Sequence, residues 1–595
     1  MGFNPFFKSI FTALLLLHMC ALQAENTEYA LPTIKVEPDK AEPQSQAEAP
    51  AESPIADQPV ETGYLFVSRI ELQDSTVLSD EEVRRVVGPY ENKRITSQEL
   101  QVIRAELTQL YIDKGYISSG VVLPRQTVSE GKVVFQAVEG QLVRIEIEGD
   151  PSIRDGYVSK RVQRNLQGAT NLKDIQYALN MLQTDQNVAR LDARLEPGEN
   201  PGEGVLKVSV EEPKKFSAFT SFDNYRSPVV GTNRGSLGVQ ARNLTGFGDL
   251  LSATGSITDG TDEWSVFYTL PFTANDNLLD LYYQRSNSEV VEGAVEDLDI
   301  ENETDTAGIR ITHPFISTLE HEFSMSLGFE YKKNQSQLLG FDFSLSPGAQ
   351  DGETKTATPQ LGANYINRGD SHVFTLSGLY SRGIDALDAT IFEPENELDK
   401  LRNPTGADGE FDLFFVQAFY LKRLNSLGLF EGLSDRAQFE LGGRLQWTDD
   451  SLLSLQKASI GGRYTVRGYQ ESLLNRDRGG SVTAELQFPV PGYIPDPNVR
   501  NLVIAPFIDL GWAQDSEDID PNSTVRDTSD SRYILGAGLG LIWQPFKGFY
   551  SEVYWGADLA DNFDDDDPRD FQTRDDELQD DGIYFQFRYD FPSFW

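Results

Sequence analysis

The chain has 595 residues, a formal net charge of −42 and a mean hydropathy of −0.39. This length predicts several domains, and the acidic balance excludes nucleic acid as an expected partner, because nucleic-acid binding requires basic patches. The only cysteine, Cys20, lies in a segment that we expect to be removed, so the mature chain uses neither disulfides nor thiols.

Residues 1–24 have the pattern of a secretory signal peptide. Lys8 supplies a positive charge, Ile10–Leu17 form an apolar core, and the small residue Ala24 fits a cleavage site. The apolar core is too short to cross a bilayer as a helix. Residues 25–61 are rich in Pro, Ala and Glu, a composition that predicts a linker without a core of its own.

Two small α+β domains are expected next, at residues 62–140 and 141–213. In the first, Thr96 and Glu99 have the spacing of a capping box that starts a helix. The order of elements there is strand, helix, helix, strand, strand. The same order recurs between Leu142 and Val210, which predicts a tandem of similar modules.

Residues 214–595 lose helical periodicity and show alternating strands separated by Gly, Asn and Asp. We expect a transmembrane β-barrel of 16 antiparallel strands, because bacterial outer-membrane barrels have even strand numbers and closure pairs every backbone polar group in lipid. A large soluble β-domain is the alternative, which the signal peptide and the strand number disfavour. The expected strands start near Phe216, Gly235, Asp249, Trp264, Asn277, Thr306, Glu320, Thr356, His372, Phe411, Ala437, Ser481, Val503, Tyr533, Tyr550 and Ile583.

The last expected strand carries aromatic residues on one face. Phe587, Tyr589 and Phe591 alternate with polar residues, and the terminal Trp595 is in phase with them. Such an outward apolar face is typical of a barrel strand that meets lipid. We interpret these four residues as a C-terminal barrel-assembly signal.

No pattern in the chain indicates catalysis, a cofactor or a metal site. The four histidines have no metal-ligand spacing, and the chain has neither a nucleophile elbow nor a phosphate-binding glycine loop. Acidic runs such as Glu296–Asp305 are typical of solvated loops, and Asp564–Asp567 lack the spacing of a calcium-binding EF-hand loop. The chain is therefore not expected to be an enzyme.

A candidate functional pair joins a loop inserted at about 450–480 to a later strand. Arg467 in this loop would need a carboxylate partner inside a barrel, and Asp509 would face the lumen if Ile508 faced lipid. From spacing alone, two unrelated surface charges remain an equal alternative. The two motifs comprise Val466, Arg467, Gly468 and Tyr469 in the loop and Phe507, Asp509 and Gly511 in the strand.

These motifs resemble those of the TpsB transporters of two-partner secretion, the haemolysin secretion/activation (ShlB/FhaC/HecB) family of the BamA-like superfamily. Val466–Tyr469 matches the tetrad at the tip of the family's inward-folded loop, and Phe507–Gly511 matches the inner-wall motif that its arginine contacts. Asn243–Asp249 and Tyr268–Pro271 resemble signatures of the early barrel. The first module resembles a POTRA domain through Gly115-Tyr116, Pro124-Arg125-Gln126 and Glu139-Gly140.

The resemblance implies a protein exporter in the outer membrane of a Gram-negative bacterium. Two periplasmic POTRA domains would recognise an unfolded TpsA exoprotein through its N-terminal secretion domain, and the barrel would carry it to the cell surface. Further implied partners are the barrel assembly machinery and outer-membrane lipids. A BamA- or TamA-like insertase and a passive porin or adhesin are the alternatives. Two POTRA modules, rather than three or more, favour the exporter.

The resemblance is weakest at the N-terminus. Better-known members begin with an amphipathic helix that plugs the barrel. Residues 25–61 contain six prolines, which leave little room for such a helix. We therefore do not expect a long plug helix in this chain.

Overall fold

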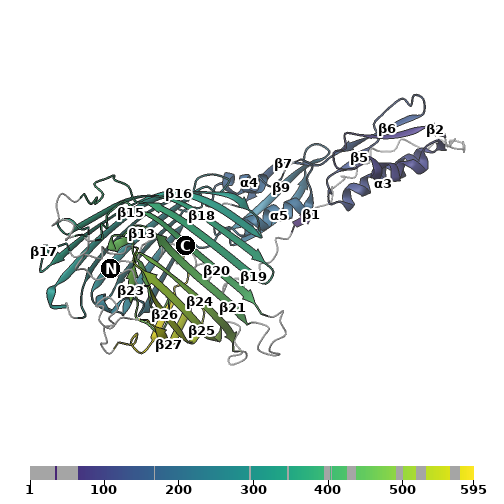
Figure 1. Ribbon diagram of the computed structural model, residues 1–595. Coiled ribbons are helices and arrows are strands. Elements are labelled where there is room, and N and C mark those ends of the chain that lie inside the picture. The colour runs from purple at the N-terminus through teal and green to yellow at the C-terminus, as the bar shows by residue number, and fades with distance from the viewer. Residues whose placement is uncertain are drawn as a thin grey trace. The chain divides into compact units, whose positions relative to one another are not determined.

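The computed structural model describes residues 34–36, 64–149, 151–166, 168–293, 296–344, 348–393, 403, 405–424, 437–490, 500–516, 531–562 and 577–594 (Figure 1). Lys214–Trp595 belong to one compact unit and Thr27–Pro213 to another. The expected signal peptide lies outside the described residues. Within the described ranges, no helix is long and apolar enough to cross a membrane.

The first module packs two helices against short strands. The predicted capping box at Thr96 and Glu99 is confirmed, and Ser79 and Glu82 form a second one. Strands β3, β6 and β5 form a sheet in that order, and β2 pairs with β4. The elements are β2 (Leu65–Val67), β3 (Arg69–Gln73), α2 (Asp80–Val87), η1 (Gly88–Tyr90), β4 (Lys93–Ile95), α3 (Ser97–Asp113), β5 (Gly120–Val122) and β6 (Lys132–Val138).

Two of the short motifs in the first module hold its backbone together. The carboxylate of Glu139 accepts hydrogen bonds from the N–H groups of Thr76 (2.6 Å) and Val77 (3.0 Å). Burial raises the pKa of Glu139, but the hydrogen bonds from Thr76 and Val77 outweigh it and lower that pKa below its usual value. The carboxamide of Gln126 pairs with both backbone groups of Val134, at 2.7 and 2.8 Å, as a neighbouring strand would.

The second module has the predicted order of strand, helix, helix, strand, strand, whereas the first has the additional short strand β4 between its helices, which the sequence did not predict. The sheet of the second module has the strand order β1-β8-β9-β7. Strand β1 (Ile34–Val36) comes from the expected linker and pairs in parallel with Ala193–Leu195 of β8. The linker prediction did not foresee this strand, because three residues are too few to show alternation; the open edge of β8 supplies its hydrogen bonds. The other elements are β7 (Gln141–Glu148), α4 (Asp155–Gln163), α5 (Leu172–Gln183), β8 (Arg190–Pro197) and β9 (Glu203–Glu211).

Lys214–Trp595 contain a closed antiparallel barrel, which confirms the predicted fold class. Sixteen strands of the described part close the ring, with β28 paired to β10, and the two-residue β17 (Phe341–Asp342) adds only to β16. The strands are β10 (Phe216–Asp223), β11 (Arg234–Arg242), β12 (Leu250–Ile257), β13 (Thr261–Pro271), β14 (Leu278–Glu289), β15 (Ile300–Ser317), β16 (His321–Leu338), β18 (Glu353–Gly369), β19 (His372–Arg382), β20 (Asp412–Arg423), β21 (Gln438–Thr448), β24 (Arg478–Pro489), β25 (Arg500–Gln514), β26 (Arg532–Gln544), β27 (Phe549–Asp561) and β28 (Ile583–Asp590).

Alternation along β25 separates a lipid face from a lumen face. Ile508 and Leu510 are each 50% exposed, whereas Asp509 between them is 1% exposed. This confirms the predicted orientation of Asp509 toward the interior. A buried polar side chain there is costly unless it has a hydrogen-bond or ionic partner.

The terminal strand alternates in the same way. In β28, Phe587 is exposed on the outer face and Gln586 is buried inside. Phe591, which follows the strand, is also exposed. Tyr589 pairs with Thr220 of β10 across the closing seam, and Trp595 lies outside the described residues. The assembly role of these residues stays a prediction.

Candidate functional site

The inserted loop runs from residue 449 to 477, between β21 and β24, close to the expected range of 450–480. Strands β22 (Ala458–Ile460) and β23 (Leu474–Arg476) pair with each other and carry a tip that we define as residues 461–473. We call residues 452–456, which include the short helix η5 (Ser454–Gln456), the outer arm. The tip and the outer arm contact different strands of the barrel.

Arg467 at the tip makes a bidentate ion pair with Asp509 on β25. Its Nε and Nη2 donate to the two carboxylate oxygens at 2.7 and 2.8 Å, and its backbone N–H donates to the same group at 3.0 Å. The remaining Nη1 donates to Glu485 of β24 at 2.6 Å. Both Arg467 and Asp509 are 1% exposed, so this is a buried, charge-assisted contact of the stronger kind.

The other motif residues make this approach sterically feasible. The guanidinium carbon of Arg467 lies 3.4 Å from the ring centre of Phe507, a cation–π contact. A Cβ at Gly511 would meet Val466 at 2.6 Å, and one at Gly468, whose φ is +102°, would meet the backbone of β27 at 2.8 Å. Both glycines are therefore required by close approach of the tip to the wall.

Tyr469 fastens the tip to two further strands. Its hydroxyl lies 2.9 Å from the carbonyl oxygen of Ala560 on β27 and 3.3 Å from that of Leu535 on β26, close enough for a hydrogen bond to either. Its own carbonyl accepts from the hydroxyl of Tyr584 on β28, and the N–H of Gly468 donates to that hydroxyl at 3.1 Å. The structure thus brings all seven motif residues to one place.

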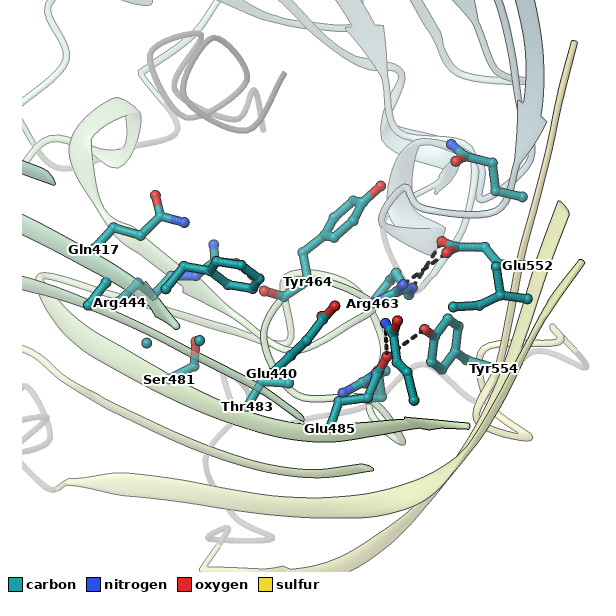
Figure 2. A pocket seen from close by; sticks show the side chains of 18 of the residues that line it. Gln417, Glu440, Arg444, Arg463, Tyr464, Ser481, Thr483, Glu485, Glu552 and Tyr554 are labelled. Carbon is teal, nitrogen blue, oxygen red and sulfur yellow. Dashed lines mark hydrogen bonds and ion pairs between the residues drawn. The ribbon is translucent and has the colours of Figure 1, made fainter. Parts of the chain in front are cut away.

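A second ion pair, which sequence reasoning missed, joins the tip to β27. Arg463 donates to the two carboxylate oxygens of Glu552 at 3.2 and 3.1 Å. The hydroxyls of Tyr225 and Tyr550 donate to the same carboxylate at 2.7 and 2.6 Å. Figure 2 shows Arg463 and Glu552 pointing toward one another, with Tyr554 nearby. The only sequence signal was a second arginine in the same glycine-rich loop.

The tip also contacts the chain at the closing seam of the barrel. Gln579, just before β28, accepts a hydrogen bond from the N–H of Glu471 at 3.0 Å. Its amide donates to the carbonyls of Asn224 and Arg226, which follow β10. Asn224 in turn bonds the backbone of Phe585 on β28 at 2.8 Å. One buried carboxamide therefore links the loop to both strands of the seam.

The outer arm contacts the opposite part of the wall through weaker interactions. Gln456 accepts from Lys332 of β16 at 3.5 Å and donates to Thr356 of β18 at 3.3 Å. Leu452 packs with Leu413 of β20 and with Phe411, the residue before this strand. The loop therefore crosses the interior from β16 and β18 to β25, β27 and β28.

Side chains of the tip and of the wall that faces it border an interior cavity of about 200 Å³ (Figure 2). Its lining includes Arg444, Arg463, Glu485 and Glu552, so charges of both signs face it. Within the described ranges, no group of three or more His, Cys, Asp and Glu side chains could hold a metal ion. The arrangement can position a loop and bind polar groups.

Two family models match the chain. The model of the haemolysin secretion/activation protein ShlB/FhaC/HecB matches residues 202–542, which is more than half of the chain. The chain belongs to this family. A model of the POTRA domain of the ShlB type matches residues 65–140. The match to a secretion family decides between the exporter and the insertase.

Relatives and a solved structure agree with this family. The heme/hemopexin transporter protein HuxB of Haemophilus influenzae is 22% identical over 517 residues, which are 85% of each chain. The outer membrane transporter CdiB of Escherichia coli is 22% identical over 83% of this chain and 82% of its own. The solved structure of CdiB from Escherichia coli has a TM-score of 0.61 and 20% identity, covering 91% of this chain and 93% of that one.

Members of the ShlB/FhaC/HecB family are outer-membrane transporters of two-partner secretion. This chain is accordingly a transporter of a TpsA exoprotein, with its barrel in the outer membrane and its POTRA region in the periplasm. The ion pairs at the loop tip lie inside that barrel.

Proposed function

We propose that this ShlB/FhaC/HecB transporter captures its exoprotein in the unfolded state and threads it through the barrel. Residues 62–140 and 141–213 serve as the two capturing POTRA domains. Capture uses strand addition to a sheet edge, which supplies main-chain hydrogen bonds with little demand on sequence. Folding of the exoprotein outside the cell gives the transport its direction.

The single observation that carries this proposal is the loop that crosses a closed barrel. Arg467 is buried against Asp509 and Glu485, and removing one partner of such a cluster leaves charges without compensation. The tip is therefore built to stay in one position against the wall while a chain passes beside it. We assign Arg467 and Asp509 a positioning role in transport and no catalytic one.

The remaining partners follow from the barrel itself. Outer-membrane lipids contact exposed apolar residues such as Ile508 and Leu510. The barrel assembly machinery inserts the barrel, with Phe587, Tyr589, Phe591 and Trp595 as the assembly signal. The protein acts without a cofactor and without enzymatic chemistry.

A deletion tests the capture step. A chain that lacks residues 64–213 should still insert as a barrel and should export no exoprotein. The measurements are the heat-modifiable migration of the barrel and the amount of exoprotein in the medium. Undiminished export by the deleted chain would contradict capture by these domains.

A further inference from the structure

The edges of the two main sheets in the POTRA region differ in how they are covered. In the first module, Glu91 accepts a hydrogen bond from the N–H of Ile70 on the edge strand β3, at 2.9 Å. The hydroxyl of Thr108 on α3 accepts a hydrogen bond from the N–H of Val121 on the other edge strand, β5, at 3.0 Å. An incoming strand would have to displace a side chain at either edge.

In the second module, one edge is already paired. Strand β1 lies along Ala193–Leu195 of β8, so that the middle of this edge has a strand partner. The opposite edge strand, β7, pairs only with β9 in the described sheet. An open edge of this kind is a template for another extended chain.

A groove of about 480 Å³ runs along this open edge. The consecutive residues Gln141–Ile145 of β7 line it, together with Ser159 and Gln163 of α4. The groove therefore lies against this stretch of β7, whose outer backbone groups have no strand partner in the described sheet. A Cβ at Gly168 on its rim would meet nothing within 4 Å.

The backbone of β7 is irregular at the groove. The pairing with β9 shifts between Leu142 and Arg144, which leaves Val143 without a partner residue in β9. Val143 is 52% exposed. Bulges of this kind interrupt pairing and redirect side chains at binding edges.

We infer that the edge of β7, with the groove between β7 and α4, is the place where the second POTRA module binds an extended segment of the exoprotein. This inference rests on the proposed function and names the surface that performs its capture step. The groove borders five residues of β7, a length of about 17 Å at the rise of a strand. The incoming backbone pairs with β7, and its groove-facing side chains meet polar groups such as Gln163 and Ser159.

The first test fills the groove in the full-length transporter. Ser159→Trp places an indole in the groove from α4, and Lys160→Trp, one residue further on an exposed position, is the matched control. The probe is the urea-unfolded N-terminal domain of a TpsA exoprotein that this transporter secretes. We expect Ser159→Trp to weaken binding of the probe at least about tenfold and Lys160→Trp to leave it unchanged. Equal binding by both variants overturns the inference.

The second test locates the bound segment by cross-linking. Val143→Cys marks the groove, and Val122→Cys, on the covered edge strand β5 and also exposed, is the control. A probe with a single cysteine should form a mixed disulfide with Val143→Cys and not with Val122→Cys. The opposite pattern assigns capture to the first module and overturns the inference.

The deletion of residues 64–213 separates this inference from the proposed function. If the deleted chain binds no probe while Ser159→Trp binds it normally, capture by the POTRA domains is supported and its assignment to the edge of β7 is wrong. If the deleted chain still binds the probe and exports the exoprotein, the proposed function itself fails.

Discussion

The tip of the inserted loop and its outer arm are attached to the barrel in different ways. Arg467 and Arg463 make four charge-assisted hydrogen bonds to Asp509 and Glu552. The side chain of Gln456 in the outer arm makes contacts at 3.3 and 3.5 Å, and its backbone carbonyl accepts one hydrogen bond from Gln446 of β21 at 2.8 Å. Breaking a buried ion pair by removing one partner costs about 3–5 kcal/mol, whereas a single hydrogen bond contributes about 0.5–1.5 kcal/mol. The tip is thus the fixed end of the loop, and the outer arm is the end that is easier to release.

The largest effect is expected for Arg467→Ala. The variant leaves Asp509 and Glu485 buried without their cation, at a cost of about 3–5 kcal/mol. We expect the barrel to insert and secretion to fall below detection. Secreted exoprotein in the medium, normalised to heat-modifiable barrel, is the measurement.

The matched control for this variant is Arg382→Ala. Arg382 is 61% exposed at its side chain and lies 3.8 Å from Asp412, and such exposed pairs contribute about 0–1 kcal/mol. The control should secrete like the wild type. Normal secretion by Arg467→Ala would contradict the positioning role that we assign to Arg467 at the tip.

A smaller effect is expected for Glu552→Gln. The amide oxygen still accepts hydrogen bonds from Tyr225 or Tyr550, but the charge that pairs with Arg463 is lost. Because the Arg463 side chain is 15% exposed and the amide oxygen stays as an acceptor, the cost should lie below that of a fully broken buried pair, which is about 3–5 kcal/mol. Secretion should fall partially, and proteases should cut the loop tip more readily. Glu322→Gln, in a half-exposed pair with Arg368, is the control. A loss as complete as that of Arg467→Ala would show that the two ion pairs act as one unit.

The outer arm is tested by Gln456→Leu. The variant removes a neutral hydrogen bond to Thr356, worth about 0.5–1.5 kcal/mol, and a long contact of 3.5 Å with the ammonium of Lys332. Lys332 keeps its ion pair with Glu330 at 3.1 Å. We expect normal secretion and more frequent openings in single-channel recordings from planar bilayers. Gln337→Leu, which removes a hydrogen bond to Asp342 where β16 pairs with β17, is the control. If Gln456→Leu abolishes secretion, the arm is not the weaker end.

In the POTRA region, the contribution of the hydrogen bonds of the Glu139 carboxylate to stability can be measured through its pH dependence. Despite the opposing effect of burial, hydrogen bonds from Thr76 and Val77 lower the pKa of Glu139. A lowered pKa stabilises the fold above the unfolded value of about 4.3, and this stabilisation is lost as pH falls through the folded value. We expect urea unfolding of fragment 27–213 to require less urea at pH 3 than at pH 6.

Glu139→Gln should reduce this acid dependence slightly, because Glu82, whose pKa falls to about 2 beside Lys114, contributes in the same direction. Glu106→Gln, on the exposed face of α3, is the control and should behave like the wild type. An identical pH dependence in Glu139→Gln and wild type would mean that Glu139 does not stabilise the fold through its charge.

Much of the fold could be predicted because its signals are local. Alternation in each strand located all sixteen strands that close the barrel, and the capping box at Thr96 located the start of α3. Strand β1 could not be predicted, since its partner β8 is more than 150 residues away and its own three residues carry no periodicity.

The candidate site was only partly visible in the sequence. Arg467 and Asp509 were paired through the order of two short motifs, although spacing alone left the pair open. Arg463 and Glu552 are separated by 89 residues and Gly468 and Tyr584 by 116, and no local pattern connects them. Gln579 and Gln456 carry no charge and no motif, so nothing in the sequence marked them.

The sequence by itself determined the class of this protein, because strand alternation, capping and binary patterning act within a few residues. It also determined that an arginine in a glycine-rich loop would need a carboxylate. Only the tertiary structure decided which carboxylates meet which arginines and that the loop spans the interior. Closing the barrel brings distant strands together, and buried charges then persist only where that closure supplies partners.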